Sequence, residues 1–376
     1  MKNVIIVFFV LIVVGCQEQK TPEQLFEECS SGVVVILNEF YYELKLPNGN
    51  SVYFTGFDNE GNLENFTPDA DEIVKNRQSM TGTGFFIDEK GTIMTNRHVV
   101  EPQLDVAKAK TAYVKIIKAI KTLFEYANSQ MEEQYAELER QKNECSYYDL
   151  NTNMYYYDTE RLQAINNKQQ ELVNSYNETK KALEELNSLT DLSSLKIEVK
   201  CQIGIAYNNS YVTNINDFFG SKECVVTKIS EKEDVDLALI RLKNQKTPTE
   251  AFVFDINGEQ EEEKDVIERV RSFFDKGKDN GELKIDQKLY MIGYNAGLIL
   301  GNTKQGIKVQ MTSGKLTQMP DGQRLLYSIP TMRGSSGSPV IDEKGSLVGV
   351  NFAKLSGTDN FNFGIPIDIV RKFYKY

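Results

Sequence analysis

The sequence has a single histidine, His98, no tryptophan, and no run of Lys and Arg. None of its five cysteines stands in a Cys-x-x-Cys pair. These absences argue against a zinc site of the usual His and Cys ligands, and no metal or other cofactor is expected. The formal net charge is −11. Because affinity for nucleic acids comes mainly from Lys and Arg on phosphates, the composition excludes nucleic acid as a partner.

The apolar run at the N-terminus is short. It covers Val4–Val14, eleven residues, whereas a membrane-spanning helix needs roughly 20. This size fits the core of a signal peptide. Gly15 and Cys16 follow, and the ending resembles a bacterial lipobox, which implies cleavage before Cys16 and attachment of lipid, such as palmitate, to its sulfur. An ordinary secretory signal or a short anchor is the alternative.

This resemblance predicts how the N-terminus is organised. Residues 1–15 would be a lipoprotein signal peptide and residues 16–28 a polar tether. The mature protein would lie outside the cytoplasm in the bacterial cell envelope, held to a membrane by its lipid anchor. An exported compartment permits disulfides. Cys201 and Cys224 flank strand-like segments and could pair across a sheet, but with Cys29 and Cys145 three pairings are possible.

Much of the chain has the composition of short strands separated by turns. β-Branched and aromatic residues dominate the segment after Gly32, where Pro47–Asn50 has the sequence of a hairpin turn. "GTGFFIDEKGTIMTNRHVV" (82–100) predicts strand, turn and strand, with His98 at the strand end. "DVDLALIRL" (234–242) predicts a buried strand that begins with acids. The last segment, "IDIVRKFYKY", predicts a closing helix.

Two segments have helical periodicity instead. Residues 104–142 contain no Gly or Pro and have apolar residues at steps of three and four, and residues 159–189 repeat the pattern. A short break joins them, so we expect an antiparallel hairpin over 104–189. It would be either a coiled-coil arm that binds a partner protein or gates a site, or a solvated hairpin packed on its own domain. A smaller helical insert is expected at about 259–276.

Four blocks of the remaining sequence resemble trypsin-like (chymotrypsin-fold) serine proteases, most closely the peptidase domain of the bacterial HtrA/Deg type. They are "GTGFFIDEKGTIMTNRHVV", "DVDLALIRL", "MIGYNAG" and "GSSGSPVIDEKGSLVGVN". The resemblance implies a mainly β, two-lobed double β-barrel interrupted by the long helical hairpin. Residues 29–103 and 190–376 would form the peptidase domain, with the second lobe at about 285–376.

The resemblance also implies roles for individual residues. His98 would be the general base, Asp236 would orient it, and Ser336 would be the nucleophile, in the order typical of chymotrypsin-like barrels. The backbone N–H groups of Gly334 and Ser336 would form the oxyanion hole. The sequence leaves two alternatives open. Ser335, adjacent to Ser336, could be the nucleophile, and Asp234, which would face the same side of a strand as Asp236, could be the orienting carboxylate.

The chemistry of serine supports these roles independently of the resemblance. A serine hydroxyl is a poor nucleophile at neutral pH until an imidazole takes its proton, and a carboxylate must hold that imidazole in the right tautomer. Only His98 can serve, because the sequence has no other histidine. Glycines around the serines permit a turn whose N–H groups converge on one oxyanion.

The resemblance places the primary substrate pocket at Pro330, Thr331 and a wall of Asn351, Phe352 and Ala353. Pro330 stands where trypsin has the Asp that binds Lys or Arg, so a small or medium apolar side chain is expected there. HtrA proteins usually continue into a PDZ domain, and none is expected here. We therefore expect a serine endopeptidase acting on a protein or peptide substrate. The alternative is a catalytically silent or latent barrel that binds proteins through its helical arm.

Overall fold

The computed structural model describes residues 19–232, 234–257, 283–354 and 362–376. They divide into two compact units. Unit one contains the chain up to Glu39, then Ser79–Pro102 and Cys201–Tyr376. Unit two contains Phe40–Gln78 and Gln103–Lys200, so residues 40–78 group with the expected helical insertion. The expected lipidation site at Cys16 and the expected helix at 259–276 lie outside the described residues.

The first barrel is antiparallel wherever the register is defined, and a pairing between β1 and β9 closes it. β1 and β9 run from one unit into the other. Its six strands, in spatial order, are β1 (Val33–Lys45), β5 (Gln78–Phe86), β6 (Thr92–Thr95), β11 (Ala238–Leu242), β10 (Glu223–Ile229) and β9 (Lys196–Tyr207).

The second barrel lies wholly in unit one and is closed by pairing of β17 with β12. Its strands, in spatial order, are β12 (Lys288–Gly293), β15 (Gln310–Gln318), β16 (Leu325–Tyr327), β19 (Asn362–Pro366), β18 (Leu347–Lys354) and β17 (Pro339–Ile341). A small ribbon of β13 (Asn302–Thr303) and β14 (Gly306–Ile307) and the closing helix α8 (Ile367–Lys375) complete this half of the chain. The two-lobed double barrel expected from the sequence is confirmed.

One apolar core joins residues from both ends of unit one. Alternate residues of β1, such as Val33 and Val35, pack in the same cluster as Tyr294 and as Phe373 of α8. The hydroxyl of Tyr294 donates to the backbone O of Val33 at 3.5 Å, and burial raises the pKa of Tyr294. The alternation of a strand brings Val33 and Val35 to one face, and this face supplies the packing that a sheet needs.

Residues 22–28 are not part of a tether, which corrects the expectation from sequence. They form α1 (Pro22–Cys29), and Thr21 and Gln24 close its N-terminus as a capping box. Leu25 and Cys29, one helical turn apart, are buried in the core of unit one. The segment is mostly polar, so its sequence did not predict a helix. Its two buried side chains are nevertheless enough to hold the helix against the core.

Unit two combines short strands with the long helical hairpin. The turn at Pro47–Asn50 joins β1 to β2 (Ser51–Phe54), as expected, and Leu46 N donates to Asn50 O at 2.8 Å. The rest of the unit consists of β3 (Gly56–Phe57), β4 (Leu63–Glu64), α2 (Ala70–Lys75), α4 (Val106–Asn143), β7 (Ser146–Asp149), β8 (Met154–Tyr157) and α5 (Thr159–Ser188).

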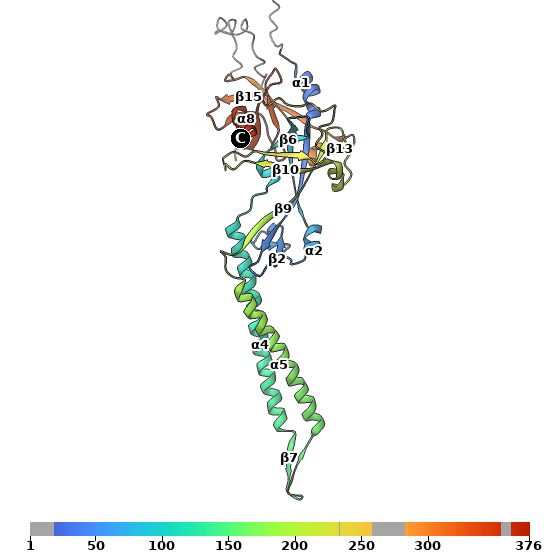
Figure 1. Ribbon diagram of the computed structural model, residues 1–376, viewed down its shortest axis with the longest axis vertical. Coiled ribbons are helices and arrows are strands. Elements are labelled where there is room, and N and C mark those ends of the chain that lie inside the picture. The colour runs from blue at the N-terminus through green and yellow to red at the C-terminus, as the bar shows by residue number, and fades with distance from the viewer. Residues whose placement is uncertain (1–18, 233, 258–282, 355–361) are drawn as a thin grey trace, which may run out of the picture. The chain divides into compact units, whose positions relative to one another are not determined.

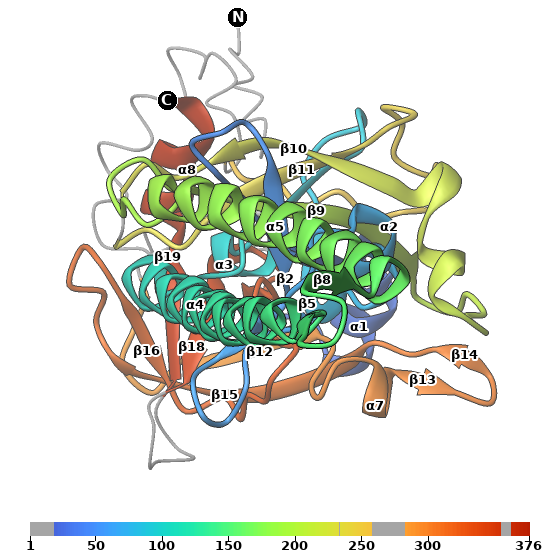
Figure 2. The same cartoon turned by 90° about the horizontal axis from the view of Figure 1, so that it is seen from below.

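The two long helices confirm the expected antiparallel hairpin. They lie side by side in two perpendicular views (Figures 1 and 2). Each has an aspartate cap, with Asp105 accepting from Lys108 N and Asp158 from Arg161 N. Not every apolar residue of the helical repeat is covered: Leu123 of α4 is 66% exposed, because a contact between two helices covers only a narrow strip of each. No helix among the described residues has both the length and the apolarity that crossing a membrane requires.

The four described cysteines are free thiols, so the pairing of Cys201 with Cys224 is not formed. Cys224 is buried, while Cys201 lies on an exposed position. Burial raises the pKa of the Cys29 and Cys224 thiols to about 12. Both therefore stay protonated at neutral pH and act as small apolar side chains.

Candidate active site

His98 and Asp236 meet in unit one. His98 lies in the short helix α3 (Arg97–Val100), just after β6 rather than at its end, and Asp236 precedes β11. The His98 Nδ1 atom is 2.6 Å from Asp236 Oδ2, and the backbone N–H of His98 donates to Oδ1 at 3.0 Å. The side chains are 33% and 22% exposed. With Nδ1 bonded to the carboxylate, His98 keeps Nε2 for a proton from a reacting group.

The local sequence explains why Asp236, rather than Asp234, meets the histidine. Val235 and Leu237 are both buried, and Leu237 N donates to Val235 O at 2.9 Å, so the turn between them presents Asp236. Asp234 is exposed. Asn96, next to α3, donates through Nδ2 to the backbone O of Asp236 at 2.7 Å, which fixes the aspartate against the segment that carries His98.

The two adjacent serines have opposite environments. Ser335 is 2% exposed, and its hydroxyl donates to Met332 O at 2.7 Å and accepts from Asn351 Nδ2 at 3.2 Å. Ser336 is half-buried, and its Oγ makes no hydrogen bond within the described part of the chain. The structure therefore leaves one reachable, uncommitted hydroxyl in this loop, at Ser336. No hydrogen bond joins it to His98 here, and such catalytic bonds often form only with substrate.

Two backbone N–H groups in the same loop also donate no hydrogen bond to any described residue. Ser335 N donates to Met332 O, Gly337 N to Asn351 O and Ser338 N to Ser335 O, at 2.8 to 3.1 Å. Among the described residues, Gly334 N and Ser336 N have no acceptor. These are the two donors expected to form an oxyanion hole. The φ of Gly334 is +104°, in the left-handed region that glycine adopts without strain.

Comparison of the sequence with protein-family models matches part of this region. Residues 206–350 match the family model described as "Trypsin-like peptidase domain". Residues 206–350 are therefore similar to trypsin-like peptidase domains. The matched residues include Asp236 and Ser336, whereas His98 lies on the N-terminal side of the helical insertion, outside the match.

Among solved structures, the chain is similar to one titled "Crystal structure of the serine endoprotease from Yersinia pestis". The two are 12% identical with a TM-score of 0.40, and the similarity covers 94% of this chain. The chain spans 65% of the length of that structure. A comparison with curated proteins finds no match.

Thr83 of β5 is a residue of the candidate site that sequence reasoning missed. Its N–H donates to Ser336 O at 2.8 Å, and its hydroxyl donates to Gly334 O at 2.8 Å. The same hydroxyl accepts from Tyr294 N at 3.1 Å. Thr83 thus holds both carbonyls that flank Ser335, one through its backbone N–H and one through its hydroxyl. Its position in "GTGFF" was a signal, but threonine carries no reacting group in this chemistry.

The expected pocket residues occupy different environments. Pro330 is exposed and Phe352 is half-buried, as a pocket lining requires. Thr331 is buried, with its hydroxyl bonded to Asn362 Oδ1 at 2.8 Å. Asn351 is 2% exposed, and besides Ser335 it bonds the hydroxyl of Tyr327 at 2.7 Å. The structure therefore places Asn351 as a support of the serine loop. Ala353 lies in β18 opposite Phe363.

Space for the Ser338 side chain is provided by a glycine of the second barrel. A Cβ atom on Gly293 would lie 1.9 Å from Ser338 Oγ. Ser338 is fully buried, and its hydroxyl has no hydrogen-bond partner among the described residues. Gly293 at the end of β12 therefore provides the space that the serine side chain needs beside the loop.

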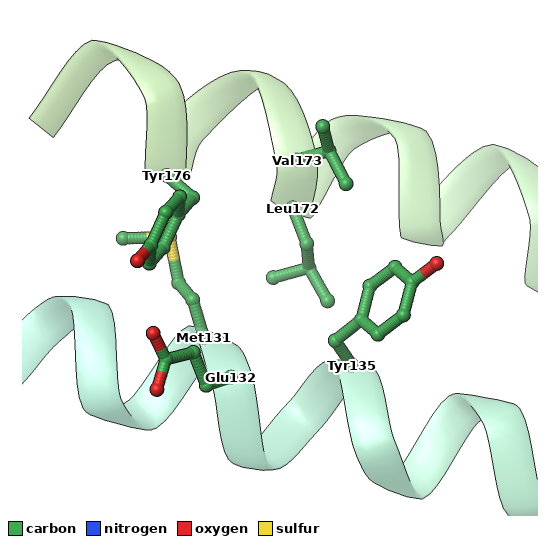
Figure 3. A pocket seen from close by; sticks show the side chains of 6 residues that line it. All are labelled: Met131, Glu132, Tyr135, Leu172, Val173 and Tyr176. Atoms are coloured by element: carbon green, nitrogen blue, oxygen red, sulfur yellow. The ribbon is translucent and has the colours of Figure 1, made fainter. Parts of the chain in front are cut away.

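Unit two has a feature of a different kind, a groove of about 260 Å³ between the helices of the hairpin (Figure 3). α4 contributes Met131, Glu132 and Tyr135, and α5 contributes Leu172, Val173 and Tyr176. The lining is mostly apolar, and nothing in the structure indicates what would cover it.

Proposed function

We propose that the chain is a serine endopeptidase that cleaves peptide bonds through an acyl-enzyme intermediate. Its triad would be His98, Asp236 and Ser336. The observation that carries the proposal is the 2.6 Å contact between His98 Nδ1 and Asp236 Oδ2, formed in the same unit as a serine hydroxyl without other bonds. A carboxylate on Nδ1 leaves Nε2 as the basic atom, which is the tautomer that this chemistry needs.

The steps follow from the residues present. Ser336 Oγ attacks the scissile carbonyl carbon while His98 Nε2 takes the hydroxyl proton. The carbonyl oxygen becomes an oxyanion, and Gly334 N–H and Ser336 N–H donate to it. Collapse of the tetrahedral intermediate breaks the C–N bond, and His98 gives its proton to the leaving amine. Water, activated by His98, then hydrolyses the ester and releases Ser336.

Substrate binding is proposed for the exposed surface beside Pro330 and Phe352. Neither residue is charged, so the proposal favours small or medium apolar side chains over Lys or Arg at the residue before the cleaved bond. The membrane tether through a lipid on Cys16, outside the cytoplasm, stays part of this proposal. Its support is the apolar run Val4–Val14 followed by Gly15 and Cys16.

Cleavage of a fluorescein-labelled unfolded protein tests the proposal. We expect the wild type to release labelled peptides and Ser336→Ala to lose about 10⁶-fold in kcat, because the nucleophile acts as a unit with its base. Ser221→Ala, which removes an exposed hydroxyl in unit one, is the matched control and should cleave like the wild type. Equal cleavage by Ser336→Ala would rule out Ser336 as the nucleophile.

A further inference from the structure

The end of the helical hairpin is a two-stranded ribbon, which we call the tip hairpin (residues 145–158). β7 and β8 connect α4 to α5 and pair only with each other among the described strands (Figure 1). Both outer edges of the ribbon therefore present backbone N–H and C=O groups that no neighbouring strand uses. Neither strand contains Lys or Pro, the residues with which exposed edges are commonly protected.

The tip hairpin exposes an unusual amount of apolar surface for so small an element. A ribbon of two four-residue strands has no core of its own in which to bury large side chains. Exposed groups of large apolar residues on soluble proteins commonly mark interaction sites. Seven such residues are 41% to 86% exposed: Tyr147, Tyr148, Leu150, Met154, Tyr155, Tyr156 and Tyr157.

The tyrosines are ordered on both faces of the ribbon. Tyr147 lies opposite Tyr156, with ring centroids 5.5 Å apart and an interplanar angle of 18°. Tyr148 lies opposite Tyr155, with centroids 5.0 Å apart. Because side chains alternate along a strand, the two pairs are on opposite faces. Each face therefore offers aromatic rings that are already arranged, which lowers the entropy lost on binding.

The charge of the tip hairpin is of one sign. Within residues 145–158 the charged residues are Asp149 and Asp158, and there is no Lys or Arg, whereas Glu144 beside the ribbon is paired with Arg161 at 3.4 Å. Asp149 accepts hydrogen bonds from Asn151 N at 2.8 Å and from Thr152 Oγ1 at 3.0 Å. The bond from the Asn151 backbone N–H, together with that from Thr152, lowers the pKa of Asp149, so its carboxylate stays charged near neutral pH.

We propose that the tip hairpin binds an extended segment rich in Lys and Arg of a partner protein, which adds to the ribbon as a third strand. The open edges would supply main-chain hydrogen bonds. The carboxylates and the tyrosine rings would both attract cations, the rings through their negatively charged faces. No step uses Ser336, so the proposal does not depend on proteolysis.

Other occupants fit the same surface less well. An anionic lipid surface or a nucleic acid would meet the carboxylates of Asp149 and Asp158 and no Lys or Arg within the tip hairpin. A second tip hairpin would bring the same acidic residues together, and like charges across an interface disfavour association. Charge complementarity therefore selects a cationic protein segment.

Fluorescence anisotropy on the full-length Ser336→Ala protein tests the proposal, since this background prevents cleavage of the probe. The probes are fluorescein-labelled peptides of about ten residues that alternate Val or Thr with Lys and Arg, or with Glu, or with Gln. We expect only the Lys and Arg peptide to bind, and its affinity to fall as salt rises. Methylation of alternate backbone nitrogens in that peptide should weaken binding by about tenfold or more, because it removes strand donors.

Variants locate the binding surface. Tyr147→Ser combined with Tyr155→Ser removes one ring from each face and should weaken binding about tenfold or more. Glu160→Gln, which removes an exposed carboxylate next to the tip hairpin, should weaken it at low salt. The matched control combines Tyr126→Ser and Tyr211→Ser, which are 66% and 70% exposed outside the tip hairpin, and should bind like the parent. Circular dichroism should show unchanged helix content in each variant.

Four results would overturn the proposal. They are equal binding of the acidic and basic peptides, binding of the basic peptide that the tip variants leave unchanged, and binding unaffected by backbone methylation. The fourth is binding to phosphatidylcholine vesicles, or self-association through the tip hairpin in sedimentation, without binding of the basic peptide.

Discussion

Replacing Asp236 by asparagine should lower kcat for peptide or ester substrates about 10⁴-fold without unfolding the protein. Asn can donate or accept toward His98 Nδ1 but carries no charge to stabilise the imidazolium. It can also hold the ring in the wrong tautomer, with the proton on Nε2. Steady-state kinetics of the purified variant measures the loss, and thermal denaturation checks the fold.

The matched control is Asp234→Asn, which makes the same substitution two positions earlier on an exposed residue. It should change kcat less than about twofold, because the carboxylate lies outside the His98 contact. A large loss in Asp234→Asn together with little effect in Asp236→Asn would show that the wrong carboxylate has been assigned.

Gly334→Ala should lower kcat about 10²- to 10³-fold, the typical effect of losing one oxyanion donor. Gly334 has a φ of +104°, and an added Cβ would lie 2.4 Å from Gly297 N and 2.6 Å from Tyr294 O. The loop must shift to relieve these contacts. The N–H groups of Gly334 and Ser336 then no longer point at the same oxyanion position. KM should change far less than kcat, since the interaction forms mainly in the transition state.

Gly322→Ala is the matched control, because it places alanine at a positive φ away from the candidate active site. Gly322 also has a positive φ, +84°, in unit one, but an added Cβ would meet no atom within 4 Å. Its kcat should equal that of the wild type, with only a small fall in melting temperature. If a folded Gly334→Ala protein kept its kcat, the N–H groups of this loop would not be the oxyanion donors.

The candidate reacting groups could be named from the sequence, whereas the residues that hold them could not. His98 has no competitor of its own type, and the family resemblance pointed to Asp236, with Asp234 as the alternative. Thr83 and Asn351 act through hydrogen bonds to main-chain atoms, and Thr83 is 251 positions away from Gly334. Only the fold brings such pairs together, so a pattern within one segment cannot reveal them.

Some elements of the fold could likewise be predicted from the sequence, and others could not. Helical periodicity predicted α4 and α5 closely, because long helices repeat their pattern many times. The short helix α1 was missed because its apolar residues are few, and its stability comes from docking Leu25 in the core rather than from its composition. The grouping of residues 40–78 with the helices in unit two also depends on tertiary contacts.

Labelling with a fluorophosphonate probe, followed by mass spectrometry to locate the adduct, tests the central claim most directly. The probe reacts with a serine only when a base activates it. We predict one adduct on Ser336 in the wild type and in Ser221→Ala, and none in His98→Ala. A correctly folded wild type that stays unlabelled, or an adduct on Ser335, would contradict the account. The unlabelled protein would instead point to a silent barrel that acts by binding other proteins.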